Sequence, residues 1–204
     1  MAGELDRAMG RLKHRDIRTR RRAVRTLVEL EDPETLKAFK SLLNDEDSWF
    51  VSKALDAYRR WAPVVGVDAV QELTAHPSLN VRRCGANLLD SLGGNGTSIA
   101  KVMLDDEDSV VRRKAADALL AHGSAEAIEV MHQNANDAIR SLAMRHQSCS
   151  EKQLRDGLND DSALVQIEAL RALLDRDEPV ELSVITPFYG LQSETVKLFL
   201  WIAK

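Results

Sequence analysis

The stretch "DDEDSVVRRKAADALLAHG", residues 105–123, joins a run of acidic residues to three consecutive cations and an alanine-rich apolar segment. The same pattern recurs along the chain, and its copies can be aligned at one anchor position. Successive anchors are 26 to 31 residues apart, which is the period of proteins built from stacked structural repeats. The anchors are Thr19, Phe50, Val81, Val111, Ile139, Val165 and Val196.

Each anchor begins an amphipathic helix. Positions 0, +4, +5, +7 and +8 from the anchor are mostly apolar, and these positions share one face of an α-helix. In the clearest copy they are Val111, Ala115, Ala116, Ala118 and Leu119. A shorter apolar-periodic segment precedes each anchored helix. The sequence therefore predicts a unit of a first helix, a short turn and a second helix, here called the A helix and the B helix.

The acidic residues between the two helices are expected to cap the B helix. Asp16, Asp47, Asp108 and Asn136 stand just before a B helix, where a short oxygen side chain accepts hydrogen bonds from free backbone amides. The segment lacks the glycine and the distal glutamate of a calcium-binding loop. No metal or cofactor is expected.

The B-helix pattern resembles that of HEAT-type repeats. The motif D-x-x-V-R-x-x-A-x-x-A-L is clearest from Asp108 to Leu119, and the period of about 30 residues is similar to that of the short subclass related to phycobilin lyases. The resemblance implies an all-α fold, a right-handed α-α superhelix of about seven helix pairs. It also implies a protein-binding scaffold, with bilin lyases and alkylpurine DNA glycosylases as the enzymatic minorities.

Composition is consistent with one folded domain over residues 1–204. The chain has 44% hydrophobic residues, ten glycines, five prolines and a net charge of −4. No apolar run approaches the roughly 18 residues that a membrane span requires, and the first residues lack the apolar core of a signal peptide. With only Cys84 and Cys149, a disulfide framework is not expected. We therefore expect a cytoplasmic location and no contact with membranes.

One cation position is predicted to be structural. The residue directly after the anchor lies at the edge of the apolar face, where it can pair with a capping acid of its own or the adjacent repeat. This position is occupied by Arg20, Arg82, Arg112, Arg140 and Lys197.

The polar face of the B helices is the predicted binding surface. Its positions +2, +3, +6, +9 and +10 carry eleven cations and six acids in the first six repeats. Second helices line the concave surface of such repeat proteins, so this ridge is expected to bind another macromolecule. Ion pairs with the interspersed acids could instead neutralise it. The candidate binding residues are Arg21, Arg22, Arg25, Lys53, Arg59, Arg60, Arg83, Arg113, Lys114 and Arg145, and Arg171 is the eleventh cation.

Three functions are consistent with this surface. The first is a non-enzymatic scaffold that recognises an acidic segment of a partner protein. The second is nucleic-acid binding through phosphates along the same ridge. The third is an enzyme similar to the HEAT-like lyases or DNA glycosylases. No motif of nucleophilic or metal-dependent catalysis occurs, so no catalytic residue is assigned and the chain is not expected to be an enzyme.

The last repeat carries a candidate docking patch. Leu198, Phe199 and Ile202 occupy positions that are polar in other copies. An apolar outer face of this kind could mediate docking or self-association.

Overall fold

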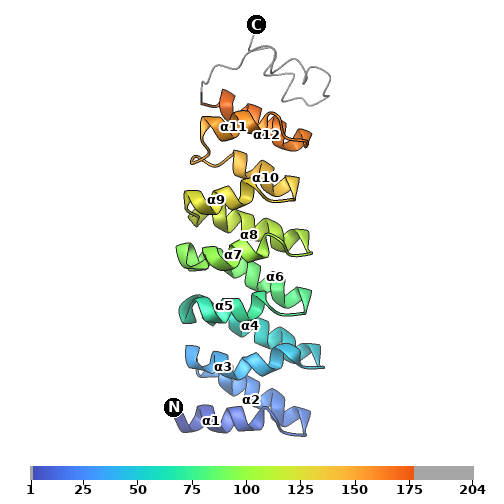
Figure 1. Ribbon diagram of the computed structural model, residues 1–204. Helices are drawn as coiled ribbons and strands as arrows, with labels where there is room; N and C mark the ends of the chain where they lie inside the picture. The colour runs from blue at the N-terminus through green and yellow to red at the C-terminus, as the bar shows by residue number, and fades with distance from the viewer. Residues whose placement is uncertain (1, 177–204) are drawn as a thin grey trace. The chain divides into compact units, whose positions relative to one another are not determined.

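The computed structural model describes residues 2–176, and in these residues it contains helices and turns and no strands (Figure 1). The predicted all-α class is confirmed. The chain divides into two compact units, residues 1–118 and 119–204, with the boundary inside helix α8. A single domain over the whole chain stays a prediction. None of the described helices is long and apolar enough to cross a lipid bilayer.

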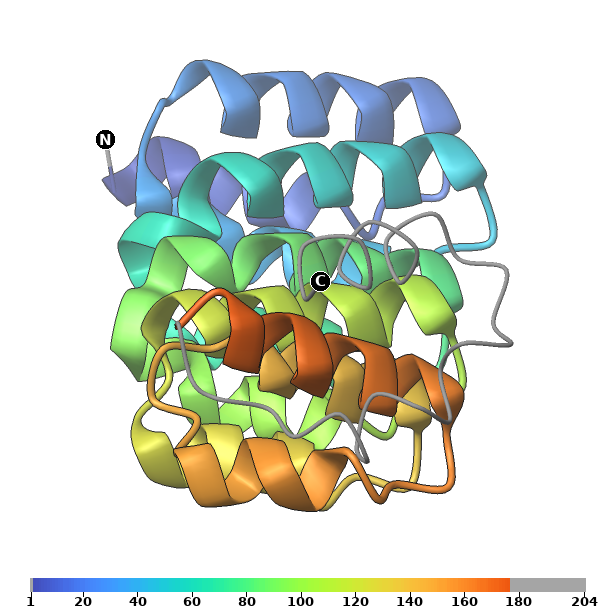
Figure 2. The same cartoon turned by 90° about the horizontal axis from the view of Figure 1, so that it is seen from above.

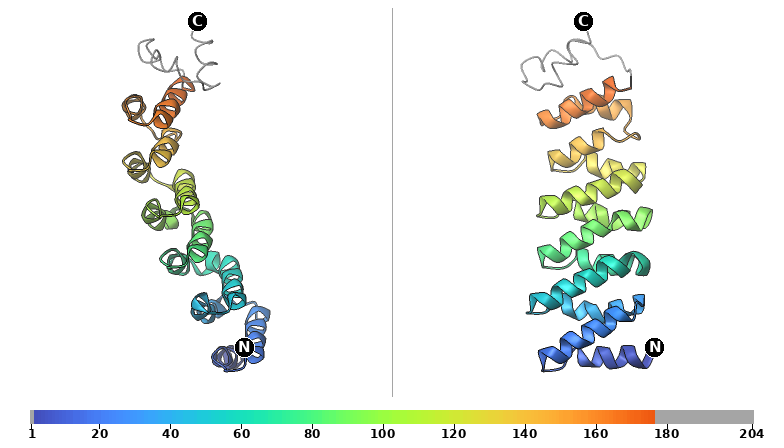
Figure 3. Two further views of the ribbon diagram at one scale, coloured as in Figure 1. Left: turned by 90° about the vertical axis from the view of Figure 1, so that its right-hand side faces the viewer. Right: turned by 180° about the vertical axis from the view of Figure 1, so that it is seen from behind.

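The first unit consists of helix pairs. Figure 3 shows its A helices in one layer and its B helices in a second layer. The A layer begins with α1 (Ala2–Arg11). Its second segment consists of three short helices in sequence, η1 (Pro33–Thr35), α3 (Leu36–Phe39) and η2 (Lys40–Asn44). The third is α5 (Val67–Thr74), and the fourth is α7 (Thr97–Met103), which is preceded by η3 (Asp90–Gly96). The B layer comprises α2 (Ile17–Glu29), α4 (Ser48–Val65), α6 (Leu79–Leu88) and α8 (Ser109–His122) up to the unit boundary.

The second unit repeats the pairing. Its described helices are α9 (Ala125–His132), α10 (Asp137–Met144), α11 (Glu151–Gly157) and α12 (Ala163–Leu174). With the four pairs that α1 to α8 form, residues 2–176 contain six helix pairs. The seventh predicted pair, with its anchor Val196, lies outside the described residues.

The aligned anchors are core positions. Phe50, Val81, Val111 and Val165 have no exposed surface, and Ile139 is 3% exposed. The five apolar positions of the copy at Val111 are all buried as well. The helical register predicted from the sequence is therefore confirmed. Thr19 is the exception, being only partly buried, and its hydroxyl donates to the capping carboxylate of Asp16 at 2.7 Å.

Neighbouring B helices of the first unit run parallel. Arg21 near the start of α2 binds Asp47 at the start of α4, and Arg60 late in α4 binds Glu31 just after α2. Figure 2 shows the two helices side by side in this orientation. Equivalent positions of α2 and α4 are therefore neighbours, as the repeat alignment predicts.

The fifth repeat has a shortened B helix. Its helix α10 ends at Met144, and the polar residues His146 and Gln147 lie in the following turn. This turn is closed by the Ser148 amide, which donates to His146 Nδ1. The core of the unit forms beyond it, where Met144, Cys149 and Leu154 pack with residues of α12.

Close approach of two helices in the first unit depends on a glycine. A β-carbon at Gly85 in α6 would lie 2.8 Å from Thr74 Cγ2 and 2.9 Å from Leu73 Cβ, both in α5. Real β-carbons do not approach other heavy atoms this closely, so any larger residue would push α5 away from α6.

We expect Gly85→Ala to destabilise the protein by about 1–3 kcal/mol, because it overpacks this contact. The matched control is Gly10→Ala in α1, where a β-carbon would meet nothing within 4 Å. That change should be neutral or stabilising by up to about 1 kcal/mol, since alanine has the higher helix propensity. Urea unfolding of both variants measures the difference, and equal stability of the two would contradict the packing argument.

Candidate binding surface

Four of the six described B helices begin at a turn with a side-chain cap, whereas Ser78 before α6 and Ser162 before α12 form no such hydrogen bond. The side chains of Asp16, Asp47 and Asn136 accept hydrogen bonds from the amides of the first turn of α2, α4 and α10. Asp108 accepts from the Val111 amide at 3.1 Å in the same way. The predicted capping role of these four residues is confirmed, and their oxygens are therefore already engaged by backbone amides.

A second polar residue, two positions before the cap, shapes the same turn. Asp45, Asp106, Asn134 and Asp160 each accept the backbone N–H of the residue two positions later, at 2.8 to 3.0 Å. Sequence reasoning missed this position. The repeated D-x-D spacing, seen as Asp45 with Asp47 and as Asp106 with Asp108, was the signal that could have revealed it.

In four described repeats the residue after the anchor is an arginine that binds the turn ahead of its own helix. Arg82 Nη1 donates to the carbonyl of Pro77 at 2.9 Å, and Arg112 Nη1 donates to the carbonyl of Asp106 at 2.7 Å. Arg140 Nη1 binds the carbonyl of Asn134 at 2.9 Å, and Arg20 Nε binds that of Leu12 at 2.9 Å. We call Arg20, Arg82, Arg112 and Arg140 the linking arginines.

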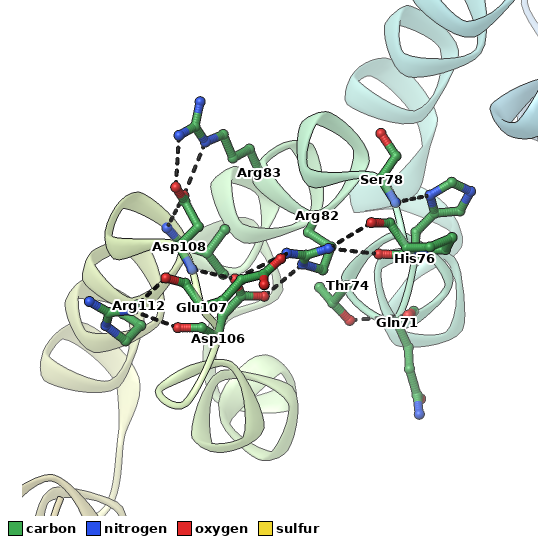
Figure 4. A network of polar contacts seen from close by, with 12 residues as sticks. Gln71, Thr74, His76, Ser78, Arg82, Arg83, Asp106, Glu107, Asp108 and Arg112 are labelled. Atoms are coloured by element: carbon green, nitrogen blue, oxygen red, sulfur yellow. Dashed lines mark hydrogen bonds and ion pairs between the residues drawn. The ribbon is translucent and has the colours of Figure 1, made fainter. Parts of the chain in front are cut away.

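Three of the linking arginines also reach the turn of the next repeat. Arg82 binds Asp106 at 2.7 Å and Glu107 at 2.6 Å (Figure 4). Arg140 binds Asp160 at 2.8 Å, and Arg20 binds Asp45 and lies over the ring of Phe50. The hydrogen bonds that Arg82 donates to Asp106 raise the pKa of Arg82 above its ordinary value. The predicted structural role of these cations is therefore confirmed, and Lys197 lies outside the described residues.

The next position along the B helix has the same function in two repeats. Arg83 donates to the cap Asp108 through Nε and Nη2, at 3.0 and 2.7 Å (Figure 4). This interaction is the main reason that the pKa of Asp108 falls to about 2. Arg21 binds the cap Asp47 at 3.1 Å and lies over Trp49. Both arginines belong to the predicted ridge, and the structure places them between adjacent repeats.

Most of the remaining ridge cations are paired within the surface. Asp56 binds both Lys53 and Arg59, at 2.9 and 3.0 Å, and Asp117 binds Arg113 at 2.8 Å. Arg60 binds Glu31 at 2.8 Å.

In the second unit, Arg145 and Arg171 both bind Glu168 at 2.8 Å, and the Glu168 side chain is only 5% exposed. Seven of the ten predicted binding residues therefore have a carboxylate partner. The three with no ion pair to any described residue are Arg22, Arg25 and Lys114, and all three are exposed.

Other candidate sites from the sequence can now be placed. The patch of Leu198, Phe199 and Ile202 lies outside the described residues. Within residues 2–176, no three His, Cys, Asp or Glu side chains are arranged to hold a metal ion. Cys84 and Cys149 are buried, and burial raises the pKa of both thiols, that of Cys149 to about 11. Neither thiol is therefore suited to nucleophilic chemistry at neutral pH.

One histidine of the second unit is held without hydrogen bonds. Both ring nitrogens of His132, at the end of α9, are buried and have no partner. Burial lowers the pKa of His132, and His146 lowers it further, whereas Glu129 acts in the opposite direction. Protonation of His132 therefore opposes the folded state.

Residues 5–83 match the family model described as HEAT repeats. This segment of the chain is therefore similar to HEAT repeats. The match begins in α1 and ends in α6, so the HEAT repeats include most of the first unit and two of the unpaired ridge cations, Arg22 and Arg25. No curated protein sequence matches the chain.

Several solved structures are similar to this chain. An archaeal HEAT-like repeats protein from Thermococcus onnurineus NA1 is 17% identical, with 95% of this chain and 83% of that chain covered and a TM-score of 0.42. The complex of CpcE and CpcF of phycocyanin lyase from Nostoc sp. PCC7120 is 16% identical, with 89% and 91% covered and a TM-score of 0.44. Human deoxyhypusine hydroxylase is 16% identical, with 98% and 94% covered and a TM-score of 0.37.

Replacing Arg82 with methionine should lower the melting temperature by several degrees. The change leaves Asp106, only 9% exposed, without its cation and frees the carbonyls of His76 and Pro77. The control is Arg113→Met, which removes only an exposed ion pair within α8 and should have little effect. Thermal unfolding followed by circular dichroism compares them, and an equal loss in both would argue against a linking role.

Acidification should destabilise the second unit through His132. Its folded-state pKa is lowered, so below about pH 6.5 the unfolded chain binds a proton that the folded chain does not, and stability falls with pH until the folded pKa is passed. His132→Leu should remove this contribution. Urea unfolding at pH 7.5 and pH 5.5 measures it, and an unchanged pH dependence in the variant would show that His132 is not responsible. His76, whose pKa burial also lowers, remains in both proteins.

Proposed function

We propose that this chain is a non-enzymatic scaffold that binds an acidic segment of another protein through the B-helix surface. The observation that carries the proposal is the separation of ridge cations into two groups. Seven are paired with carboxylates, whereas Arg22, Arg25 and Lys114 are exposed and have no ion pair to any described residue. An unpaired guanidinium or ammonium group can bind an anion without first breaking an existing contact.

The HEAT repeats support a protein as the partner, because HEAT repeats generally mediate protein interactions. The net charge of −4 favours a local contact over a long polyanion, since carboxylates such as Asp56 and Asp117 stand beside the cations of α4 and α8. A cytoplasmic location and a single domain over the whole chain belong to the same proposal. Nucleic-acid binding is the competing outcome of the experiment below.

The test compares two sets of substitutions with equal change in charge. In one variant Arg22, Arg25 and Lys114 become glutamine, and in the other Lys53, Arg59 and Arg113 do. Binding of a fluorescent polyglutamate peptide and of a short DNA duplex to the full chain is measured by anisotropy at two salt concentrations.

We expect the first variant to bind the peptide at least tenfold more weakly than the parent, and the second to bind within about threefold. Equal weakening in both variants would mean that net charge alone governs binding. Tighter binding of DNA than of the peptide, with a steep loss at the higher salt, would favour the nucleic-acid function. A pull-down from native extract with and without nuclease would then separate protein partners from nucleic-acid partners.

A further inference from the structure

Helix α2 carries a row of arginines that form no ion pair with any described residue, although Glu29 follows Arg25 by four residues in the same helix. Arg18, Arg22 and Arg25 are all exposed, and none forms an ion pair with a described residue. Their spacing of four and three residues places them on one face of the helix, with axial separations of about 6 Å and about 4.5 Å. We call these three residues the α2 arginine row. Arg18 was not among the binding residues predicted from the sequence.

The row differs from the charged surfaces of α4 and α8 because the acid of its own helix, Glu29, forms no ion pair with it. In α4 and α8, Asp56 and Asp117 bind cations of their own helix. The acid nearest the start of α2 is Asp16, and its carboxylate accepts the Thr19 hydroxyl at 2.7 Å and the Thr19 amide at 2.9 Å. These hydrogen bonds lower the pKa of Asp16. Asp16 is thus engaged as the helix cap and forms no ion pair with the row.

Exposed aliphatic side chains border the row. Ile17 is 44% exposed and Val28 is 41% exposed, and both belong to α2. They are eleven residues apart, which is close to three full helical turns, so they lie on the same side of the helix. Val28 is three residues from Arg25 and therefore its neighbour on the helix surface. A phosphate group has no apolar atoms to place against these side chains, whereas the aliphatic residues of a polypeptide do.

We infer that α2 is the main contact surface and that its partner is a short amphipathic acidic peptide segment. This inference rests on the proposed function and narrows it to one helix. Carboxylates that recur every three or four residues of a helical segment match the axial spacing of the α2 arginine row. Each guanidinium can donate two parallel hydrogen bonds to a carboxylate. Aliphatic residues on the adjoining face of the segment cover Ile17 and Val28.

The experiment uses three peptides and the full chain. The first peptide is helical, with glutamates at positions i, i+4 and i+7 and two leucines on the adjoining face. The second replaces its glutamates with glutamine, and the third replaces its leucines with serine. A DNA duplex of matched charge serves as the fourth probe. The protein variants are a triple change of Arg18, Arg22 and Arg25 to glutamine, a double change of Ile17 and Val28 to serine, and the single change Lys114→Gln. The control is Lys152→Gln in α11.

We expect the triple arginine variant to bind the first peptide at least tenfold more weakly, and the Ile17 and Val28 variant at least threefold more weakly. Lys114→Gln should weaken binding less than the triple arginine variant does, and the control Lys152→Gln, an exposed cation of an A helix, should bind like the parent. The second and third peptides should bind the parent less well than the first. All variants should melt like the parent, because the changed side chains are exposed. Thermal unfolding checks this, and the serine variant tests the site independently of the arginines.

The outcomes separate this inference from the proposed function. If the parent binds the acidic peptides and only Lys114→Gln weakens that binding, the assignment to α2 is wrong and the scaffold function stands. If the parent binds none of the acidic peptides, the proposed function itself fails. If the serine variant and the third peptide bind normally while DNA binds more tightly than any peptide, the surface is specific for nucleic acid.

Discussion

The repeat structure depends on the interactions of the arginine that follows the anchor in four of the six described repeats. A helix pair of this size cannot bury its apolar face alone, so each repeat must be held in register against the next. Arg82 does so with one guanidinium, which binds the carbonyl of Pro77 in its own turn and Asp106 in the following turn. Arg140 does the same with Asn134 and Asp160. The planar guanidinium group suits this task, because its N–H donors can bind a carbonyl and a carboxylate at the same time.

This requirement determines what the rest of the surface can do. The carboxylates of the inter-helix turns cap helices, close the turns or bind arginines of the preceding repeat. Asp106, for example, both closes its turn and binds Arg82. Arg21 and Arg83 strengthen the same junctions and are less available to a partner. The acidic cluster that first suggests a metal site is therefore structural. Free positive charge is left mainly on α2, where no turn of a described repeat uses it.

The sequence predicted the fold in considerable detail. The repeat period predicted the helix pairs, and the apolar spacing predicted their helical register. In the structure the anchors Phe50, Val81 and Val111 are fully buried, as that register requires. The short polar residues before four of the B helices predicted their caps. Helix α10 ends before His146, where a polar residue interrupts the apolar pattern of the sequence. Local rules of this kind are reliable here because each repeat contacts mainly its neighbours.

What only the tertiary structure decided is which charges are paired. Helical spacing alone puts Arg21, Arg22, Arg25 and Arg83 on one polar face, yet Arg21 and Arg83 bind carboxylates about 25 residues further along the chain. These ion pairs depend on how one repeat packs on the next, and the residue spacing within a single helix cannot predict them. The sequence by itself thus determined the helices, their caps and their buried faces, which arise from local hydrogen bonding and hydrophobic periodicity. The unpaired α2 arginine row was decided by the arrangement of repeats, because ion pairing is a property of neighbours in space.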